Sequence, residues 1–81
     1  MSSDIDATET LDVKGQNCPM PVVKTKQAID DLAAGETLEV LATDSGSVSD
    51  LAGWAEATDG VELVGQTEGD GLYTHYVRKT E

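Results

Sequence analysis

The chain holds very few of the residues that build metal sites or covalent cross-links. It has a single cysteine, Cys18, and a single histidine, His75. One cysteine excludes a disulfide within the chain. One cysteine and one histidine are too few to close a structural zinc site. We therefore expect no metal and no cofactor.

Long apolar runs are also absent. No stretch approaches the roughly 20 apolar residues that a membrane-spanning helix needs. The first residues, MSSDIDATET, lack the apolar core of a secretory signal. The sequence therefore predicts a cytoplasmic protein with no membrane partner, in a compartment where the lone thiol stays reduced.

Basic residues are scarce. Lys and Arg number 5 against 16 Asp and Glu, which gives a formal net charge of −11. Phosphates would be repelled by such a surface, and this argues against nucleic acid as a direct partner. Two interpretations of the acidity stay open: a highly solvated surface of the halophilic type, or an acidic face directed at one basic partner.

The length of 81 residues leaves room for one domain. Residues 1–9 are predicted to be a flexible acidic tail and residues 10–81 a single domain. Within the domain, hydrophobic spacing and turn residues predict these elements in order: a strand at Leu11–Val13, a helix from Pro19 or Pro21 to Ala34, a strand at Leu38–Ala42, a helix between Ser47 and Gly60, a strand from Val61, and a strand at Leu72–Val77.

Local signals place the ends of these elements. Gly35 is expected to terminate the first helix, and Ser47 with Asp50 is expected to form a capping box for the second. The run Glu68-Gly69-Asp70-Gly71 predicts a hairpin. The order β-α-β-α-β-β with two amphipathic helices predicts an α+β fold. We expect a two-layer α/β sandwich in which two helices cover one face of a four-stranded mixed sheet.

The lone cysteine lies in GQNCPMPVVK, residues 15–24, at the expected start of the first helix. A residue before proline favours extended backbone, so Cys18 is expected just outside the helix. Pro19 and Pro21 then fall in the first turn, where backbone N–H groups have no helical partner. A helix N-terminus carries positive partial charge and lowers the pKa of a thiol placed there. We therefore expect Cys18 to ionise readily.

The charges support this interpretation. No acidic residue occurs from Val13 to Ile29 or from Gly71 to Thr80, and all five bases lie in these two windows: Lys14, Lys24, Lys26, Arg78 and Lys79. Cys18 therefore lies in a non-negative stretch that favours a thiolate and an approaching partner. The alternative is an inert, buried cysteine beside an ordinary lysine face.

These residues together resemble a known family. The matching positions are Leu11-Asp12, Gly15, Cys18-Pro19-Met20-Pro21, Gly35-Glu36, Asp44, Asp50, Gly60 and Arg78-Lys79. The pattern is similar to that of the TusA-type (SirA-like) sulfur carriers, whose hallmark is Cys-Pro-X-Pro at the start of the first helix. The resemblance extends over about Thr10 to Thr80 and makes residues 10–81 a single TusA-like domain.

The resemblance implies that Cys18 accepts sulfur as a persulfide from a cysteine desulfurase or rhodanese-like donor and relays it to an acceptor protein. Such relays feed tRNA thiolation, molybdenum-cofactor synthesis or sulfur oxidation. Gly15, Pro19 and Pro21 would shape the turn.

Exposed neighbours of the thiol are the candidates for partner docking: Met20, Lys24 and Lys26. We expect a monomer that is not a stand-alone hydrolase or oxidoreductase. The alternative function is a non-catalytic interaction or redox-sensing module on the same fold, in which the thiol is oxidised to sulfenic acid.

Overall fold

The computed structural model describes residues 7–17 and 20–81. Its elements are β1 (Glu9–Asp12), α1 (Met20–Asp30), β2 (Thr37–Ala42), α2 (Ser47–Ala57), β3 (Val61–Gly69) and β4 (Leu72–Lys79). This is the predicted order. The division between a tail at 1–9 and a domain at 10–81 remains a prediction.

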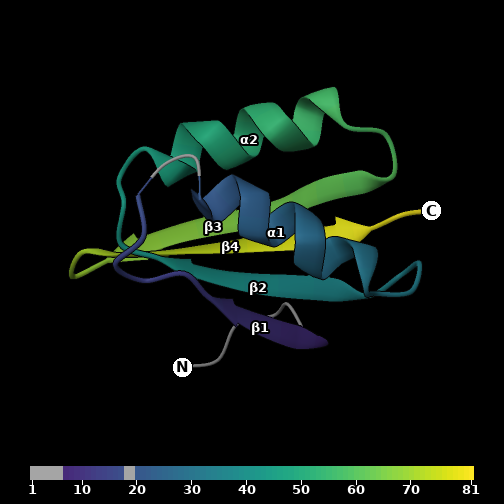
Figure 1. The fold of residues 1–81 in the computed structure, drawn as a ribbon, viewed down its shortest axis with the longest axis horizontal. Coiled ribbons are helices and arrows are strands. Elements are labelled where there is room, and N and C mark those ends of the chain that lie inside the picture. The colour runs from purple at the N-terminus through teal and green to yellow at the C-terminus, as the bar shows by residue number, and fades with distance from the viewer. Residues whose placement is uncertain (1–6, 18–19) are drawn as a thin grey trace.

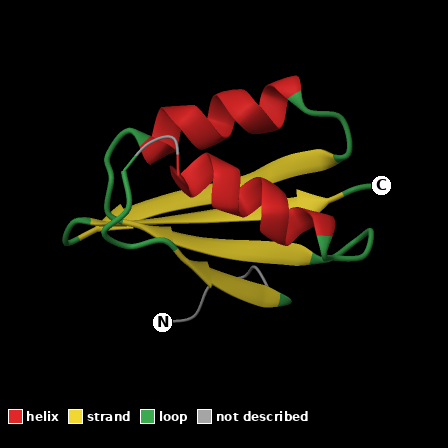
Figure 2. Cartoon of the chain, viewed as in Figure 1, coloured by secondary structure: helices red, strands yellow, loops and turns green. Residues whose placement is uncertain are grey.

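The four strands form one mixed sheet in the order β1-β2-β4-β3. β1 pairs with β2 in parallel, whereas β4 is antiparallel to both β2 and β3. Both helices lie on the same face of this sheet (Figure 1), so the molecule has two layers. Figure 2 shows the same arrangement by element type. The predicted α+β sandwich is confirmed.

The core lies between the two layers. Alternate residues of β2, which are Leu38, Val40 and Ala42, point toward the helices and are at most 1% exposed. Ile29 of α1 and Leu51 of α2 belong to the same buried cluster. Burying one such side chain contributes about 1.5–3 kcal/mol. Period-2 alternation in β2 and helical spacing in α1 and α2 therefore predict the core-facing positions.

The first helix ends earlier than predicted. α1 stops at Asp30 because the following N–H groups bond three residues back: Asp31 N–H donates to Ala28 O at 3.1 Å, and Leu32 N–H to Ile29 O at 3.0 Å. Such bonds tighten a last turn and end the α-helical ladder. The prediction that Gly35 terminates this helix is wrong. Gly35 lies in the turn into β2 with a φ of 93°.

The start of the second helix also differs from the prediction. Gly46 is the N-cap residue, and no side chain makes a capping hydrogen bond there. Ser47 is already helical, and its buried hydroxyl lies 2.9 Å from a ring nitrogen of His75. The expected capping box is therefore wrong, because the serine side chain turns into the core. Asp44 organises the turn instead, since its Oδ1 accepts the Gly46 N–H at 3.1 Å.

The predicted hairpin is confirmed. β3 and β4 are joined by Asp70 and Gly71, which have φ values of 54° and 79°. Two positive φ values in a two-residue loop are the requirement of a type I′ turn, and Asp-Gly is a favoured sequence for it.

The parallel pairing of β1 and β2 determines where the next segments begin. Both strands end at the same edge of the sheet, and there the Val13 N–H donates to Leu41 O at 2.9 Å. The loop from β1 to α1 and the loop from β2 to α2 therefore leave the sheet side by side. Gly15 to Asn17, which precede the motif cysteine, lie in the first of these two loops, and Met20 and Pro21 of the motif begin α1.

Candidate functional site at the start of the first helix

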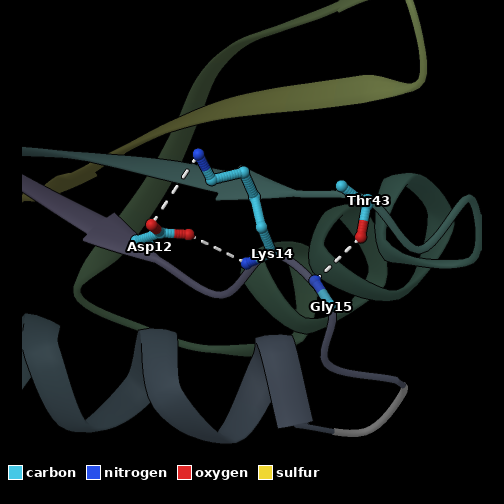
Figure 3. Close-up of polar contacts among 4 residues, drawn as sticks. All are labelled: Asp12, Lys14, Gly15 and Thr43. Atoms are coloured by element: carbon cyan, nitrogen blue, oxygen red, sulfur yellow. Dashed lines mark hydrogen bonds and ion pairs between the residues drawn. The ribbon is translucent and has the colours of Figure 1, made fainter.

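The β1–α1 loop leaves the sheet along a fixed path. Val13, the first residue beyond β1, is fully buried. Lys14 contacts Asp12 through two atoms: its N–H donates to Oδ1 at 3.0 Å, and its Nζ lies 3.8 Å from Oδ2 (Figure 3). The ion pair is solvent-exposed and contributes little by itself. The backbone bond, however, fixes the direction of the chain at Lys14.

Gly15 follows in a conformation that other residues avoid. Its φ is 82°, and a Cβ built there would meet nothing within 4 Å. The demand for glycine is therefore conformational and not steric. Its N–H donates to the hydroxyl oxygen of Thr43 at 2.9 Å, from the first position after β2 (Figure 3). This bond connects the two loops at the sheet edge.

The chain is held again where α1 begins. The Met20 N–H donates to Asn17 O at 2.9 Å. Pro21 is the second residue of α1 and is fully buried. Its missing N–H breaks no helical bond, because the first four donors of a helix have no partner in the helix. The predictions for Cys18 and Pro19 lie outside the described residues.

The charges on α1 oppose the usual arrangement. Its first turn holds no acidic residue and its last turn no basic one. α2, by contrast, has Asp50 in its first turn. Carboxylates near a helix N-terminus offset the positive end of the helix dipole. The N-terminus of α1 therefore keeps its positive partial charge, although the whole chain carries a net charge of −11.

Two lysines lie on α1, Lys24 in its first half and Lys26 in its second half, where it lines a hollow with Asp59 and Glu81. Among the described residues, neither Lys24 nor Lys26 pairs with a carboxylate within 4.0 Å. Lys26 is exposed, whereas Lys24 is half-buried, as expected of a long side chain whose stem packs on the surface. Lys14 differs from both because it lies against Asp12.

The bases of the second acid-free window serve the fold. Arg78 forms an ion pair with Glu62 on β3. The Lys79 ammonium donates to Leu32 O at 2.8 Å, just beyond the end of α1. A cation at this end of a helix is favourable. Of the two acid-free windows in the sequence, only the window that contains Cys18 therefore has lysines that pair with no carboxylate and no helix end among the described residues.

Apolar side chains are exposed on the same part of α1. Met20 and Val23 are each 38% exposed. At 3.6 residues per turn they lie about 60° apart around the helix, with Lys24 on one side and Lys26 on the other. This set of four residues, which we call the α1 face, includes the three residues predicted for docking.

A second polar group lies deep in the fold. His75 of β4 is fully buried, and its Nε2 lies 2.9 Å from Ser47 Oγ at the start of α2. Its Nδ1 lies 3.0 Å from Gln66 Nε2 of β3, which also donates to Val48 O at 3.0 Å. Burial lowers the pKa of His75, so the neutral ring is favoured.

The hydrogen bonds determine the tautomer of this ring. Val48 O is only an acceptor, so the Gln66 atom beside it is the NH₂ group, and the same group donates to His75 Nδ1. The proton of the neutral ring is then on Nε2, which donates to Ser47 Oγ. A histidine in this state cannot accept a proton from the serine. The group ties α2 to the sheet and is not a Ser-His nucleophile.

The sequence did not indicate Thr43 or the contacts of His75. Thr43 is an exposed threonine after a strand, which carries no motif. His75 was expected to be a sheet residue, but the partners of its ring come from β3 and α2. Only a known strand register would have brought Gln66 opposite His75.

The described part of the chain offers neither a metal site nor a membrane-spanning helix. In residues 7–17 and 20–81, no group of three or more His, Cys, Asp or Glu side chains is placed to hold a metal ion. Neither helix in this part of the chain has the length and apolar character needed to cross a membrane.

Comparison with known proteins identifies the family. The family model described as "Sulfurtransferase TusA" matches residues 9–79. The chain belongs to the TusA family. Its members include proteins named "Sulfur carrier protein TusA" in Allochromatium vinosum, 36% identical over 75 residues, and in Pseudomonas entomophila, 39% identical over 77 residues. The match covers 93% of this chain and 97% of the first relative, and 95% of both chains for the second.

A second curated relative and a solved structure agree with this family. A Halobacterium salinarum protein with a provisional sulfur-carrier name is 75% identical over all 81 residues of both chains. The crystal structure of a SirA-like protein from Desulfitobacterium hafniense has a TM-score of 0.77 and 32% identity, covering 90% of this chain and 99% of that one. The resemblance to TusA-type carriers is confirmed, and a sulfur carrier role follows from it.

Proposed function

We propose that the chain carries sulfur as a persulfide on Cys18. It accepts the sulfur from a donor protein, either a cysteine desulfurase or a rhodanese-like protein, and relays it to an acceptor protein. The observation that supports this most is electrostatic. The segment with Cys18 leads into a helix whose first turn holds no acidic residue and which carries two lysines that pair with no carboxylate among the described residues.

The transfer needs no oxidant or cofactor. The Cys18 thiolate attacks the outer sulfur of the donor's persulfide, and the S–S bond of the donor breaks. The donor cysteine leaves as a thiolate with the electron pair, and Cys18 now carries the outer sulfur as an S–S group. Attack by the acceptor on that outer sulfur restores the Cys18 thiolate. The positive end of α1 favours the anion present before and after each step.

We also propose that partners dock on the α1 face. Met20 and Val23 offer exposed apolar surface, and the flanking Lys24 and Lys26 offer positive charge. A partner with an apolar patch bordered by carboxylates matches this surface. The same acidity that repels nucleic acid then directs acidic partners to this one end. We place the protein in the cytoplasm as a monomer, without membrane or direct nucleic acid contact.

Mass spectrometry tests the carrier role directly. The purified chain is incubated with a cysteine desulfurase and L-cysteine, and the peptide with Cys18 is examined. We expect a mass gain of one sulfur atom that reductant removes, and no gain in Cys18→Ser. A redox-sensing module would instead gain oxygen at Cys18 on exposure to peroxide and no sulfur from the desulfurase. That pattern would refute the carrier role.

Docking is tested by neutralising lysines one at a time. Lys24→Gln and Lys26→Gln should each slow sulfur acceptance at low salt, and the effect should shrink as salt screens the charges. Lys14→Gln is the matched control, because Lys14 already lies against Asp12. Equal losses in all three variants would refute a specific role for the α1 face.

A further inference from the structure

Thr43 is an exposed side chain with a defined partner. It is the first residue after β2, and its hydroxyl oxygen accepts the Gly15 N–H at 2.9 Å (Figure 3). It contributes nothing to the buried core. The bond joins two loops that are 28 residues apart in the chain. Its effect is therefore on the position of one loop relative to the other.

The Thr43 side of this bond is the more firmly held. Ala42 before it is fully buried in β2. After it, Asp44 accepts the Gly46 N–H on Oδ1 at 3.1 Å and the Ser47 N–H on its backbone oxygen at 2.9 Å. Ser47 in turn is bound to His75 in the interior. The acceptor is thus fixed by the sheet and by α2 before it meets Gly15.

The Gly15 side is the one that needs a restraint. Glycine has more backbone freedom than any other residue, and its φ of 82° is one of several accessible values. Gly15 precedes Cys18 by three residues. Within the described part of the chain, its N–H donates to the Thr43 hydroxyl. A turn bond from the Gln16 N–H to Val13 O at 3.1 Å also spans Gly15, but it comes from the same loop. When the Thr43 acceptor is removed, Gly15 loses the bond that ties its own N–H to the neighbouring β2–α2 loop.

We propose that Thr43 is a positioning residue for the sulfur chemistry of Cys18, acting through the backbone of Gly15. The inference rests on the proposed function of Cys18. It requires only an acceptor oxygen at this point. Serine therefore retains the role, whereas valine, which has the same shape without the oxygen, loses it. One neutral hydrogen bond corresponds to about a two- to tenfold change in an equilibrium.

The test compares Thr43→Val, Thr43→Ser and a control, Thr67→Val, which makes the same change at an exposed position on β3. Two rates are measured: sulfur acceptance from a cysteine desulfurase, and alkylation of the thiol by iodoacetamide at neutral pH. We expect Thr43→Val to slow both by about two- to tenfold, the size of one lost hydrogen bond. Thr43→Ser and Thr67→Val should stay near the wild-type rates.

Rescue by serine separates positioning from general stability. Urea unfolding of each variant shows whether the fold is retained. Wild-type rates in Thr43→Val would overturn the proposal, as would equal slowing in Thr43→Ser and Thr43→Val. Alkylation does not depend on the carrier role. If the wild-type chain gained no sulfur, the proposed function would fail, while the alkylation rates would still decide the role of Thr43.

Discussion

Thr25 of α1 has a buried side-chain hydroxyl that makes no hydrogen bond in the part of the chain that the structure describes. The residue is fully buried, and among the described residues its hydroxyl is the one buried side-chain group without a hydrogen-bond partner. A threonine inside a helix commonly bonds the carbonyl four residues back, but no such bond is made here. Replacing Thr25 with valine keeps the branched shape and removes the unsatisfied oxygen.

The size of the effect follows from the cost of burial. Leaving a buried polar group without a partner costs about 1–3 kcal/mol. Threonine and valine have nearly equal helix propensities, so little is lost elsewhere. We expect Thr25→Val to raise the free energy of unfolding by about 1–2 kcal/mol. For a domain of this size each kcal/mol raises the melting temperature by about 4–8 °C.

Ser47→Ala is the matched opposite case. Ser47 is also fully buried on a helix, but its hydroxyl is bonded to His75. Its removal leaves the ring Nε2–H unsatisfied, which should lower the unfolding free energy by about 1–3 kcal/mol. Urea unfolding with unchanged m-values measures both changes. A neutral or destabilising Thr25→Val would refute the reasoning, because it would mean that the hydroxyl has a partner.

Three other perturbations have defined signs. Burial lowers the pKa of His75, so the unfolded chain binds more protons than the folded one. The stability that the neutral ring contributes is complete above the unfolded pKa of about 6.5 and is lost as the pH falls through the folded pKa. Urea unfolding at a series of pH values should show a slope of no more than about 1.4 kcal/mol per pH unit. Added salt should raise the melting temperature, because the net charge of −11 repels itself and the screening length falls from about 10 Å at 0.1 M to about 3 Å at 1 M salt. A melting temperature that does not change with salt would exclude self-repulsion as a factor. Gly15→Ala should lower the free energy of unfolding by about 1–2 kcal/mol, because the φ of this residue is positive. Gly53→Ala, at an exposed position in the middle of α2, should raise it by up to about 1 kcal/mol. Unfolding curves that shift in the same direction for both variants would contradict this.

The elements that the sequence predicts well are those whose signals are local. Alternation identifies β2, helical spacing identifies α1 and α2, and Asp70-Gly71 specifies its turn through backbone preference alone. The errors occur where a distant contact decides. Ser47 has the sequence of a capping residue, but the buried ring of His75, 28 residues away, takes its hydroxyl. The sequence predicts that Gly35 terminates the first helix, yet its N–H donates to Lys79 O, a distant residue on β4, at 2.6 Å.

The same limit applies to the site. The motif alone identifies Gly15 and Pro21. The structure adds a physical reason for each residue type: Gly15 has a left-handed backbone, and the ring of Pro21 is buried. Thr43 carries no motif, and its importance depends on the parallel pairing of β1 and β2, which places its hydroxyl beside the Gly15 N–H. Side-chain partners that the sheet register creates are visible only when that register is known.

The two helices differ in the charge of their first turns, and α1 lacks a stabilising interaction that α2 has. α2 gains from Asp50 in its first turn, an interaction typically worth about 0.3–1 kcal/mol. α1 forgoes this at its N-terminus in a chain with 16 acidic residues, although its other end is stabilised by Lys79 from β4. Carboxylates elsewhere repel an acidic partner, so the uncompensated N-terminus and the two unpaired lysines become the favoured point of approach. Under the proposed function, the acid-free stretch has two effects: it favours an anionic sulfur on Cys18, and it directs the partner to the same segment.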